Sequence, residues 1–299
     1  MRFRHPPELR LSAWCVLAAA LVGSLVVSGC GGDSRNEAAP ATRVSAKVFD
    51  PANFDRSATV DNEWLPLRPG TQLVFVGSTK EESSRVPHRL VSTVTDLTKV
   101  VNGVRGVMIW ERDYTQGNMV EAELALFAQD KAGNVWHLGQ YPEEYENGKF
   151  VRAPAWLAGV KGARAGVVMR ADPRAGTPGY AQGYAPPPVN WVDHAKVYRQ
   201  GVKTCVPAGC YRNVLVIREF ETGKPDAFQV KYYARGLGNV RVGWAGSKDK
   251  DNEVLVLTKV VHLTPAGLRN ARAQALKMEQ HAYARSKGVY GHSQPAVPR

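Results

Sequence analysis

The sequence predicts a mainly β protein, in which an antiparallel meander forms a strongly curved sheet or half-barrel and one C-terminal α-helix follows. Three observations predict this fold class. Between residues 71 and 262, short runs rich in β-branched and aromatic residues alternate apolar with polar positions, as half-buried strands do. Turn dipeptides such as Asn102-Gly103 and Asn147-Gly148 separate these runs. A single helical pattern, from about residue 266 to 286, comes after them, with Pro265 in its first turn.

The strands can be placed in order from the turns that bound them. Most of the alternating runs end at a turn that contains Gly or Asn, the residues at which a chain reverses most easily. The helix carries a weak apolar stripe that includes Leu268, Ala275 and Leu276. The expected strands cover residues 89–100, 104–114, 119–129, 135–140, 196–204, 211–221, 227–234, 239–244 and 253–262.

Composition restricts the class of protein. The chain has 299 residues, of which 44% are hydrophobic, 22% charged and 9% aromatic, which excludes a wholly disordered chain. Lys and Arg number 39 against 27 Asp and Glu, so the formal net charge is +12. The only apolar run of nearly membrane length lies at the N-terminus, which excludes a polytopic membrane protein. We therefore expect a basic globular protein with an N-terminal export element.

The first 30 residues have the layout of an export signal. Basic residues precede an almost purely apolar stretch at 11–27, and Ser28-Gly29-Cys30 follows it. This ending resembles a bacterial lipobox. The resemblance implies that residues 1–29 are a signal peptide and that Cys30 receives diacylglycerol, usually with a further acyl chain such as palmitate. We expect an exported cell-envelope protein, anchored through Cys30 to the outer face of the cytoplasmic membrane or to the outer membrane. The alternative is an uncleaved transmembrane anchor.

The remaining chain divides into four parts. Residues 30–47 are small, polar and Pro-containing, and are expected to form a flexible tether. Residues 48–263 form the β domain, interrupted at 153–190 by a segment rich in Gly, Ala and Pro that we expect to pack over or beside the sheet. Residues 264–287 form a basic helix, and the tail at 288–299 is expected to be loose from Gly291 onward.

Two cysteines remain once Cys15 is removed with the signal and Cys30 is acylated. Cys205 and Cys210 flank a four-residue loop between two expected strands, and outside the cytoplasm they are expected to form a disulfide. A redox-active pair would usually be spaced as Cys-x-x-Cys. A metal site would need two further ligands, which the sequence does not offer at suitable spacing.

Further motifs resemble an uncharacterised group of bacterial secreted proteins and lipoproteins. The resemblance covers nearly all of the mature chain and implies no activity. Ala125, Leu157, Gly183 and Gln229 stand where the group tends to have acidic residues, so a site built from those acids would be incomplete here. The motifs are FDPANF at 49–54, DN at 61–62, PLRPGT at 66–71, AQD at 128–130 with GNVW at 133–136, AGV at 158–160 with GA at 162–163, VPAG at 206–209, KYYA at 231–234 with GLG at 236–238, AY at 282–283 and VYG at 289–291.

The motifs at 206–209 and 232–238 also resemble curved-sheet envelope proteins related to the lipoprotein-localisation half-barrels. Those proteins wrap an apolar sheet face around a lipid. The likeness implies a ligand pocket in the concave face of the sheet. Its candidate residues are Trp110, Phe127, Gln129, Trp136, Trp156, Trp191 and Tyr232. The structural alternative is that the aromatic residues form an ordinary core and that Gln129-Asp130 shapes a turn.

No sequence motif indicates catalysis. The chain has no Gly-x-Ser-x-Gly, no Gly-x-x-x-x-Gly-Lys and no His-Glu-x-x-His, so no catalytic residue, cofactor or metal site is predicted. The first hypothesis is therefore a non-enzymatic lipoprotein that binds an apolar or anionic envelope ligand in a cavity of about 300 Å³ or more. The second is a hydrolase that uses Asp130, Asp193 and His194, which must then converge within hydrogen-bond reach.

A third hypothesis is a purely structural or partner-binding role. Residues 151–203 and 265–299 are rich in Lys and Arg, which favours lipid headgroups or an anionic envelope polymer as partner. Nucleic acid is not expected as a partner of an exported lipoprotein.

Overall fold

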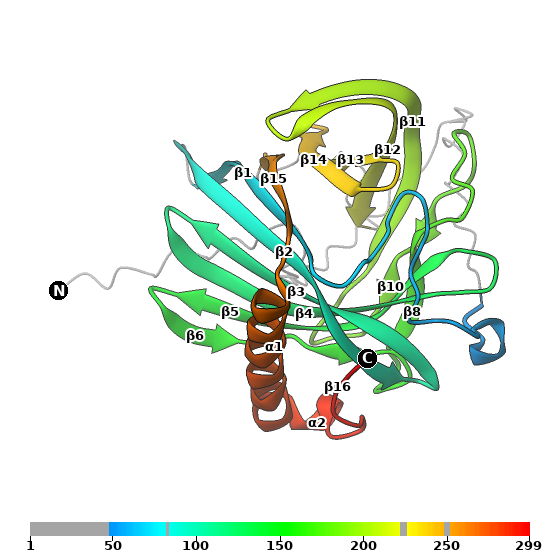
Figure 1. The fold of residues 1–299 in the computed structure, drawn as a ribbon, viewed down its shortest axis with the longest axis vertical. Coiled ribbons are helices and arrows are strands. Elements are labelled where there is room, and N and C mark those ends of the chain that lie inside the picture. Colours follow the sequence, from blue (N-terminus) through cyan, green and yellow to red (C-terminus); the bar gives the residue numbers. More distant parts are fainter. Residues whose placement is uncertain (1–47, 82–83, 222–225, 248–251) are drawn as a thin grey trace, which may run out of the picture.

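The computed structural model describes residues 48–81, 84–221, 226–247 and 252–299. The expected signal peptide, Cys30 and the tether lie outside the described residues. Within them, thirteen strands follow one another in a single antiparallel path, β10-β8-β5-β4-β3-β2-β1-β15-β14-β13-β12-β11-β9. The sheet curls until it is nearly closed, with one long helix on its outside (Figure 1). The predicted mainly β fold with a C-terminal helix is confirmed.

The first half of the sheet is a meander joined by tight turns. Asn102-Gly103 and Gln116-Gly117 both have positive φ at their two central residues, the conformation that matches the twist of a two-residue hairpin. The strands are β1 (Thr71–Glu81), β2 (Ser84–Val101), β3 (Val104–Thr115), β4 (Asn118–Gln129) and β5 (Val135–Glu146), with β6 (Lys149–Arg152) and β7 (Trp156–Leu157) paired to β5.

The second half is also antiparallel, and β15 joins it to the first half. Thr71 of β1 lies opposite His262 of β15. The hairpin of β11 and β12 curves over β13 and β14 in Figure 1. The strands are β11 (Asp193–Val206), β12 (Gly209–Glu221), β13 (Phe228–Ala234), β14 (Gly238–Ala245) and β15 (Val254–His262).

The segment at 153–190 forms part of the sheet, whereas the sequence predicted that it packs over or beside it. β8 (Arg164–Met169) pairs with β5. β9 (Tyr180–Ala181) pairs with β11, and β10 (Gly183–Tyr184), which follows after one residue, pairs with β8. One short segment thus connects the two ends of the strand path. Strands of two residues are too short to leave a periodic pattern in the sequence.

The predicted disulfide between Cys205 and Cys210 is present and stiffens the tip of the β11–β12 hairpin. The two residues lie directly opposite each other with their Cα atoms 4.0 Å apart, well inside the limit of about 7 Å beyond which two cysteines cannot be bridged. The tip reaches β15, because the backbone N–H of Ala208 donates to the carbonyl of Leu257 at 3.1 Å.

Helix α1 (Pro265–Arg285) packs on the outer face of the meander, with β2 and β4 among its neighbours. Its N-cap is Thr264, whose side chain accepts a hydrogen bond from the N–H of Gly267. The small side chains of Ala271, Ala275 and Ala282 are buried, so the helix lies close to the sheet. A short turn, α2 (Lys287–Tyr290), follows. Across the described ranges, no helix combines the length and the apolar character that crossing a membrane requires.

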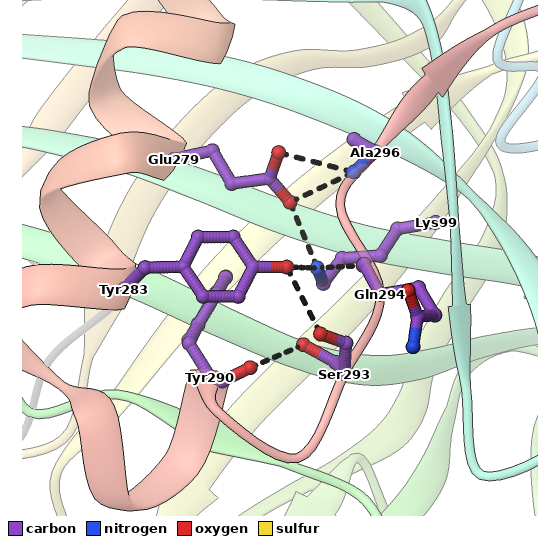
Figure 2. A network of polar contacts seen from close by, with 7 residues as sticks. All are labelled: Lys99, Glu279, Tyr283, Tyr290, Ser293, Gln294 and Ala296. Atoms are coloured by element: carbon purple, nitrogen blue, oxygen red, sulfur yellow. Dashed lines mark hydrogen bonds and ion pairs between the residues drawn. The ribbon is translucent and has the colours of Figure 1, made fainter.

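A buried lysine ties the helix and the chain end to the sheet (Figure 2). Lys99 of β2 is fully buried, and its Nζ donates to Glu279 Oε1 at 2.8 Å, to the Tyr283 hydroxyl at 2.8 Å and to the Gln294 carbonyl at 2.5 Å. Glu279 in turn accepts from the backbone N–H of Ala296 at 3.1 Å. The tail then adds β16 (Val297–Pro298) to β2. The expectation of a loose tail is therefore wrong.

Two basic side chains of α1 are also used within the fold. Arg272 contacts Asp96, and Arg285 donates to the buried Glu143 at 2.7 Å. These arginines hold the helix against the sheet. They therefore contribute less to a surface for an anionic partner than the sequence predicts.

Candidate functional site

The interior of the sheet contains a cavity of about 110 Å³. This volume is well below the roughly 300 Å³ at which pockets for drug-sized ligands begin, so the cavity is smaller than the one that the first hypothesis expected for an apolar or anionic ligand. One part of its wall is apolar and includes Leu73, Phe75, Leu90, Ile109, Val242 and Leu255. Another part is acidic and includes Glu111, Asp113, Asp193, Glu219 and Glu253.

Strand alternation places the acidic side chains inside. In β3, Ile109, Glu111 and Asp113 line the cavity, because residues two apart share a face. In β4, Glu123 lies opposite Glu111 and Glu121 lies opposite Asp113, so these two side chains share that inner face. We call Glu111, Asp113, Glu121, Glu123, Glu219 and Glu253 the acidic cluster.

His88 of β2 lies between two members of the acidic cluster. Its Nδ1 is 3.1 Å from the Thr115 hydroxyl and 3.3 Å from Asp113 Oδ1, and its Nε2 is 2.9 Å from Glu253 Oε1. Burial lowers the pKa of His88, but the hydrogen bonds and charges of the two carboxylates outweigh it and raise the pKa to about 10. His88 is therefore an imidazolium at neutral pH. The three groups are metal-ligand types within 4.8 Å of one another, yet a protonated imidazole ring has no nitrogen lone pair to offer a metal ion.

Lys231 supplies the second positive charge. It is buried, and its Nζ is 2.5 Å from Glu219 Oε2. Two glutamine side chains also donate hydrogen bonds to carboxylates of the acidic cluster. Gln182 donates to Glu219 Oε1 at 2.9 Å, and Gln229 donates to Glu253 Oε2 at 2.5 Å. Glu219 and Glu253 are thus held by both a cation and an amide.

Burial perturbs two carboxyl groups of the acidic cluster, Glu111 and Glu123. Burial raises the pKa of Glu111, and the hydrogen bond from Ser92 and the charge of Lys231 offset only part of this. Burial and the neighbouring Glu111 raise the pKa of Glu123 further. Among the described residues, the six carboxyl groups of the acidic cluster contact two basic side chains, His88 and Lys231. A strongly basic protein therefore has an acidic interior.

His137 of β5 faces the same cavity from an aromatic surround. Its ring centre lies 4.9 Å from those of Phe127 and Trp156 and 5.2 Å from that of Trp191. Burial lowers the pKa of His137 to about 3, so the imidazole is neutral. The side chain is fully buried, and neither ring nitrogen has a hydrogen-bond partner of good geometry. His137 thus offers an unused acceptor and donor beside the cavity.

The structure brings some of the expected pocket residues together. Phe127 and Trp191 line the cavity, and Trp156 packs behind them against Trp191 and His137. Trp110 instead lies under Arg112, at 4.0 Å from the guanidinium carbon, on the face opposite Glu111. The other three residues, Gln129, Trp136 and Tyr232, lie outside the cavity lining.

Gln129 and Asp130 hold the N-terminal segment in place. Gln129 Oε1 accepts from the backbone N–H groups of Asp61 and Asn62, at 3.0 and 2.8 Å. Asp130 accepts from the backbone N–H of Asn134 and from Trp136 Nε1, both at 2.8 Å. These are turn and capping contacts. The motifs at 61–62, 128–130 and 133–136 therefore hold in place the segment that brings Leu65, Pro66 and Leu67 to the cavity wall.

The three residues of the hydrolase hypothesis do not converge. Asp130 is used in its turn. Asp193 lines the cavity, whereas His194, the next residue of the same strand, stacks on Phe220 with ring centres 5.9 Å apart. Consecutive strand residues point to opposite faces, so Asp193 and His194 cannot act on one substrate.

Sequence reasoning missed the acidic cluster, His88, His137 and Lys231. One signal was present: Glu111 and Asp113 stand two and four residues after Ile109, which places charges on the apolar face of a strand. The partners come from β2, β12, β13 and the residue just before β15, and only the sheet register shows that these strands meet.

Comparisons with known proteins find only distant similarity. No protein-family model matches the chain, and no curated protein sequence matches it. Two solved structures are similar. One is a candidate exported protein with a YmcC-like fold from Bacteroides fragilis, at 13% identity and a TM-score of 0.39, covering 67% of this chain and 99% of that chain. The other is a candidate lipoprotein from Parabacteroides distasonis, at 10% identity and a TM-score of 0.31, covering 67% and 98%.

Proposed function

We propose that this chain is an exported, lipid-anchored envelope protein that binds a small molecule inside its sheet and catalyses no reaction. The observation that carries the proposal is the cavity of about 110 Å³, which combines an apolar wall, an acidic wall and the unpartnered imidazole of His137. Small-molecule sites typically join an apolar lining to a few placed polar groups. The volume argues against a whole lipid, and the acidic wall argues against an anion.

The binding proposal is tested by filling the cavity. Val94 lines it, whereas Val76 is exposed on β1, so Val94→Phe and Val76→Phe add the same group inside and outside. Native mass spectrometry of the protein extracted from its own envelope is expected to find a bound small molecule in the wild type and in Val76→Phe, and to find it depleted in Val94→Phe. Val242→Phe serves as a second filling variant if Val94→Phe does not fold. Equal occupancy in all variants, or no bound molecule in any, would contradict the proposal.

The anchoring proposal rests on the lipobox-like sequence that ends at Cys30. Cys30→Ser is expected to abolish incorporation of a palmitate analogue and to leave residues 1–29 attached, because a hydroxyl does not replace the thiol as acyl acceptor. Metabolic labelling and intact-mass analysis measure both effects. Cys15→Ser is the matched control and should be labelled and processed normally. A labelled Cys30→Ser chain would refute the assignment.

A further inference from the structure

We infer that the ligand of the cavity is a small organic amine, whose ammonium group binds beside Glu111 and whose short hydrocarbon part lies on the apolar wall. This inference rests on the proposed function, since it takes the cavity as the binding site. It adds the chemical class of the ligand, which the volume and shape of the cavity do not specify.

The first argument is the charge around Glu111. The groups that face it are Ser92 from β2, Asp113 from β3, Glu123 from β4, and Lys231 and Tyr233 from β13. Lys231 already contacts Glu219, and His88 already lies between Asp113 and Glu253. The acidic cluster therefore holds more carboxyl groups than its two cations neutralise. A cationic ligand would correct this excess, whereas an anionic one would add to it.

The second argument is independent of the acidic cluster. His137 is fully buried, neutral and without a hydrogen-bond partner of good geometry, and it lines the cavity. An ammonium group has three donors and no acceptor, and a neutral imidazole that lines the same cavity is an acceptor suited to such a donor. The aromatic rings of Phe127 and Trp191 also line the cavity, and the face of an aromatic ring attracts a cation.

The third argument separates an amine from a bare metal ion. Leu73, Phe75 and Leu255 belong to the apolar part of the wall, which a metal ion would leave uncovered. The ring of His88, which lies between Asp113 and Glu253, is protonated, so it has no nitrogen lone pair to offer a metal ion. A volume of about 110 Å³ admits an ammonium group with only a few carbon atoms, since an engineered cavity of about 150 Å³ holds benzene.

Binding of an amine should release protons. Burial keeps Glu111 and Glu123 protonated above the usual carboxyl range, and an ammonium ion beside them favours their ionised forms. The affinity for an amine should therefore rise as the pH increases through the raised pKa of these groups. It should fall again only above about pH 10, where the amine itself loses its charge.

The experiment compares three probes that share one hydrocarbon chain. Calorimetry with propylamine, propan-1-ol and propionate, in two buffers of different ionisation enthalpy, measures affinity and proton release together. Propylamine is expected to bind at least about tenfold more tightly than propan-1-ol, because hydrogen bonds to charged groups are roughly twice as strong as neutral ones. Propionate should not bind. Glu111→Gln should lose this preference, whereas Glu81→Gln, at an exposed position of β1, should keep it.

The outcomes separate this inference from the proposed function. Glu111→Gln should melt at or above the temperature of the wild type, which shows that lost binding is not lost folding; Glu123→Gln replaces it if it does not fold. Tighter binding of propan-1-ol or propionate would overturn the amine and leave the cavity as a binding site. Zn²⁺ or Mg²⁺ that displaces propylamine would also overturn it in favour of a metal. If no probe binds and the extracted protein carries no molecule, the proposed function itself fails.

Discussion

Replacing Lys99 with alanine is expected to lower the free energy of unfolding by about 3–5 kcal/mol, the usual cost of removing one partner of a buried ion pair. The change leaves the buried carboxylate of Glu279 with the backbone N–H of Ala296 as its remaining described contact. It also removes the ammonium group that lies 5.0 Å from the ring centres of Tyr283 and Tyr290. Urea denaturation followed by tryptophan fluorescence measures the loss.

Two further variants show whether the effect comes from the ion pair. Lys259→Ala truncates an exposed lysine of β15 and should change stability by no more than about 0.5 kcal/mol. Lys99→Met combined with Glu279→Gln removes both charges and keeps an acceptor for Ala296, so it should recover at least half of the loss. A cost below about 1 kcal/mol for Lys99→Ala would show that the pair does not hold the helix and tail on the sheet.

Gly166→Ala is expected to destabilise the protein by about 3 kcal/mol or more, since overpacking against backbone cannot relax by a rotamer change. A Cβ atom at Gly166 would lie 2.2 Å from the backbone N of Gly183 and 2.4 Å from the carbonyl carbon of Gln182. The substitution therefore pushes apart the segment that connects the two ends of the sheet. Denaturation measures the stability, and hydrogen exchange should show faster exchange at the amide of Gln182, which donates to the Asp193 carbonyl at 2.9 Å.

Gly243 of β14 is the matched control for Gly166. It is also a strand glycine, but no atom lies within 4 Å of the position that its Cβ would take. Gly243→Ala should therefore be neutral or slightly stabilising, because alanine reduces the freedom of the unfolded chain. Equal effects of the two substitutions would mean that the contact between Gly166 and residues 182–183 does not hold the sheet closed.

Local features of the structure were predictable because local chemistry determines them. Asn102-Gly103 favours positive φ, so the hairpin turn can be read from two residues. The helix follows from Thr264 and Pro265 before a helical pattern, and its observed bounds are Pro265–Arg285. Cys205 and Cys210 are paired as expected because a two-residue turn joins Val206 to Gly209, which leaves the two cysteines opposite each other.

The candidate site depends on register between distant strands. The sequence suggests a pocket from aromatic residues, but alternation turns Trp110 outward and its neighbour Glu111 inward. Nothing near Glu111 in the sequence indicates that Lys231 will share its interior. Closure by β9 and β10 was also unpredictable, because two-residue strands carry no periodic signal.

The pairing of Thr71 with His262 has a consequence for how and where the chain folds. The two residues come from opposite ends of the β domain, so this contact carries a large loop-closure entropy and a high contact order. A chain exported from its N-terminus delivers β1 across the membrane long before β15. The meander β1–β5 can form as it emerges, but the interior cannot be enclosed until the last strand arrives. Under the proposed export and anchoring at Cys30, the final and slowest folding step is expected to occur outside the cytoplasm, close to the membrane surface.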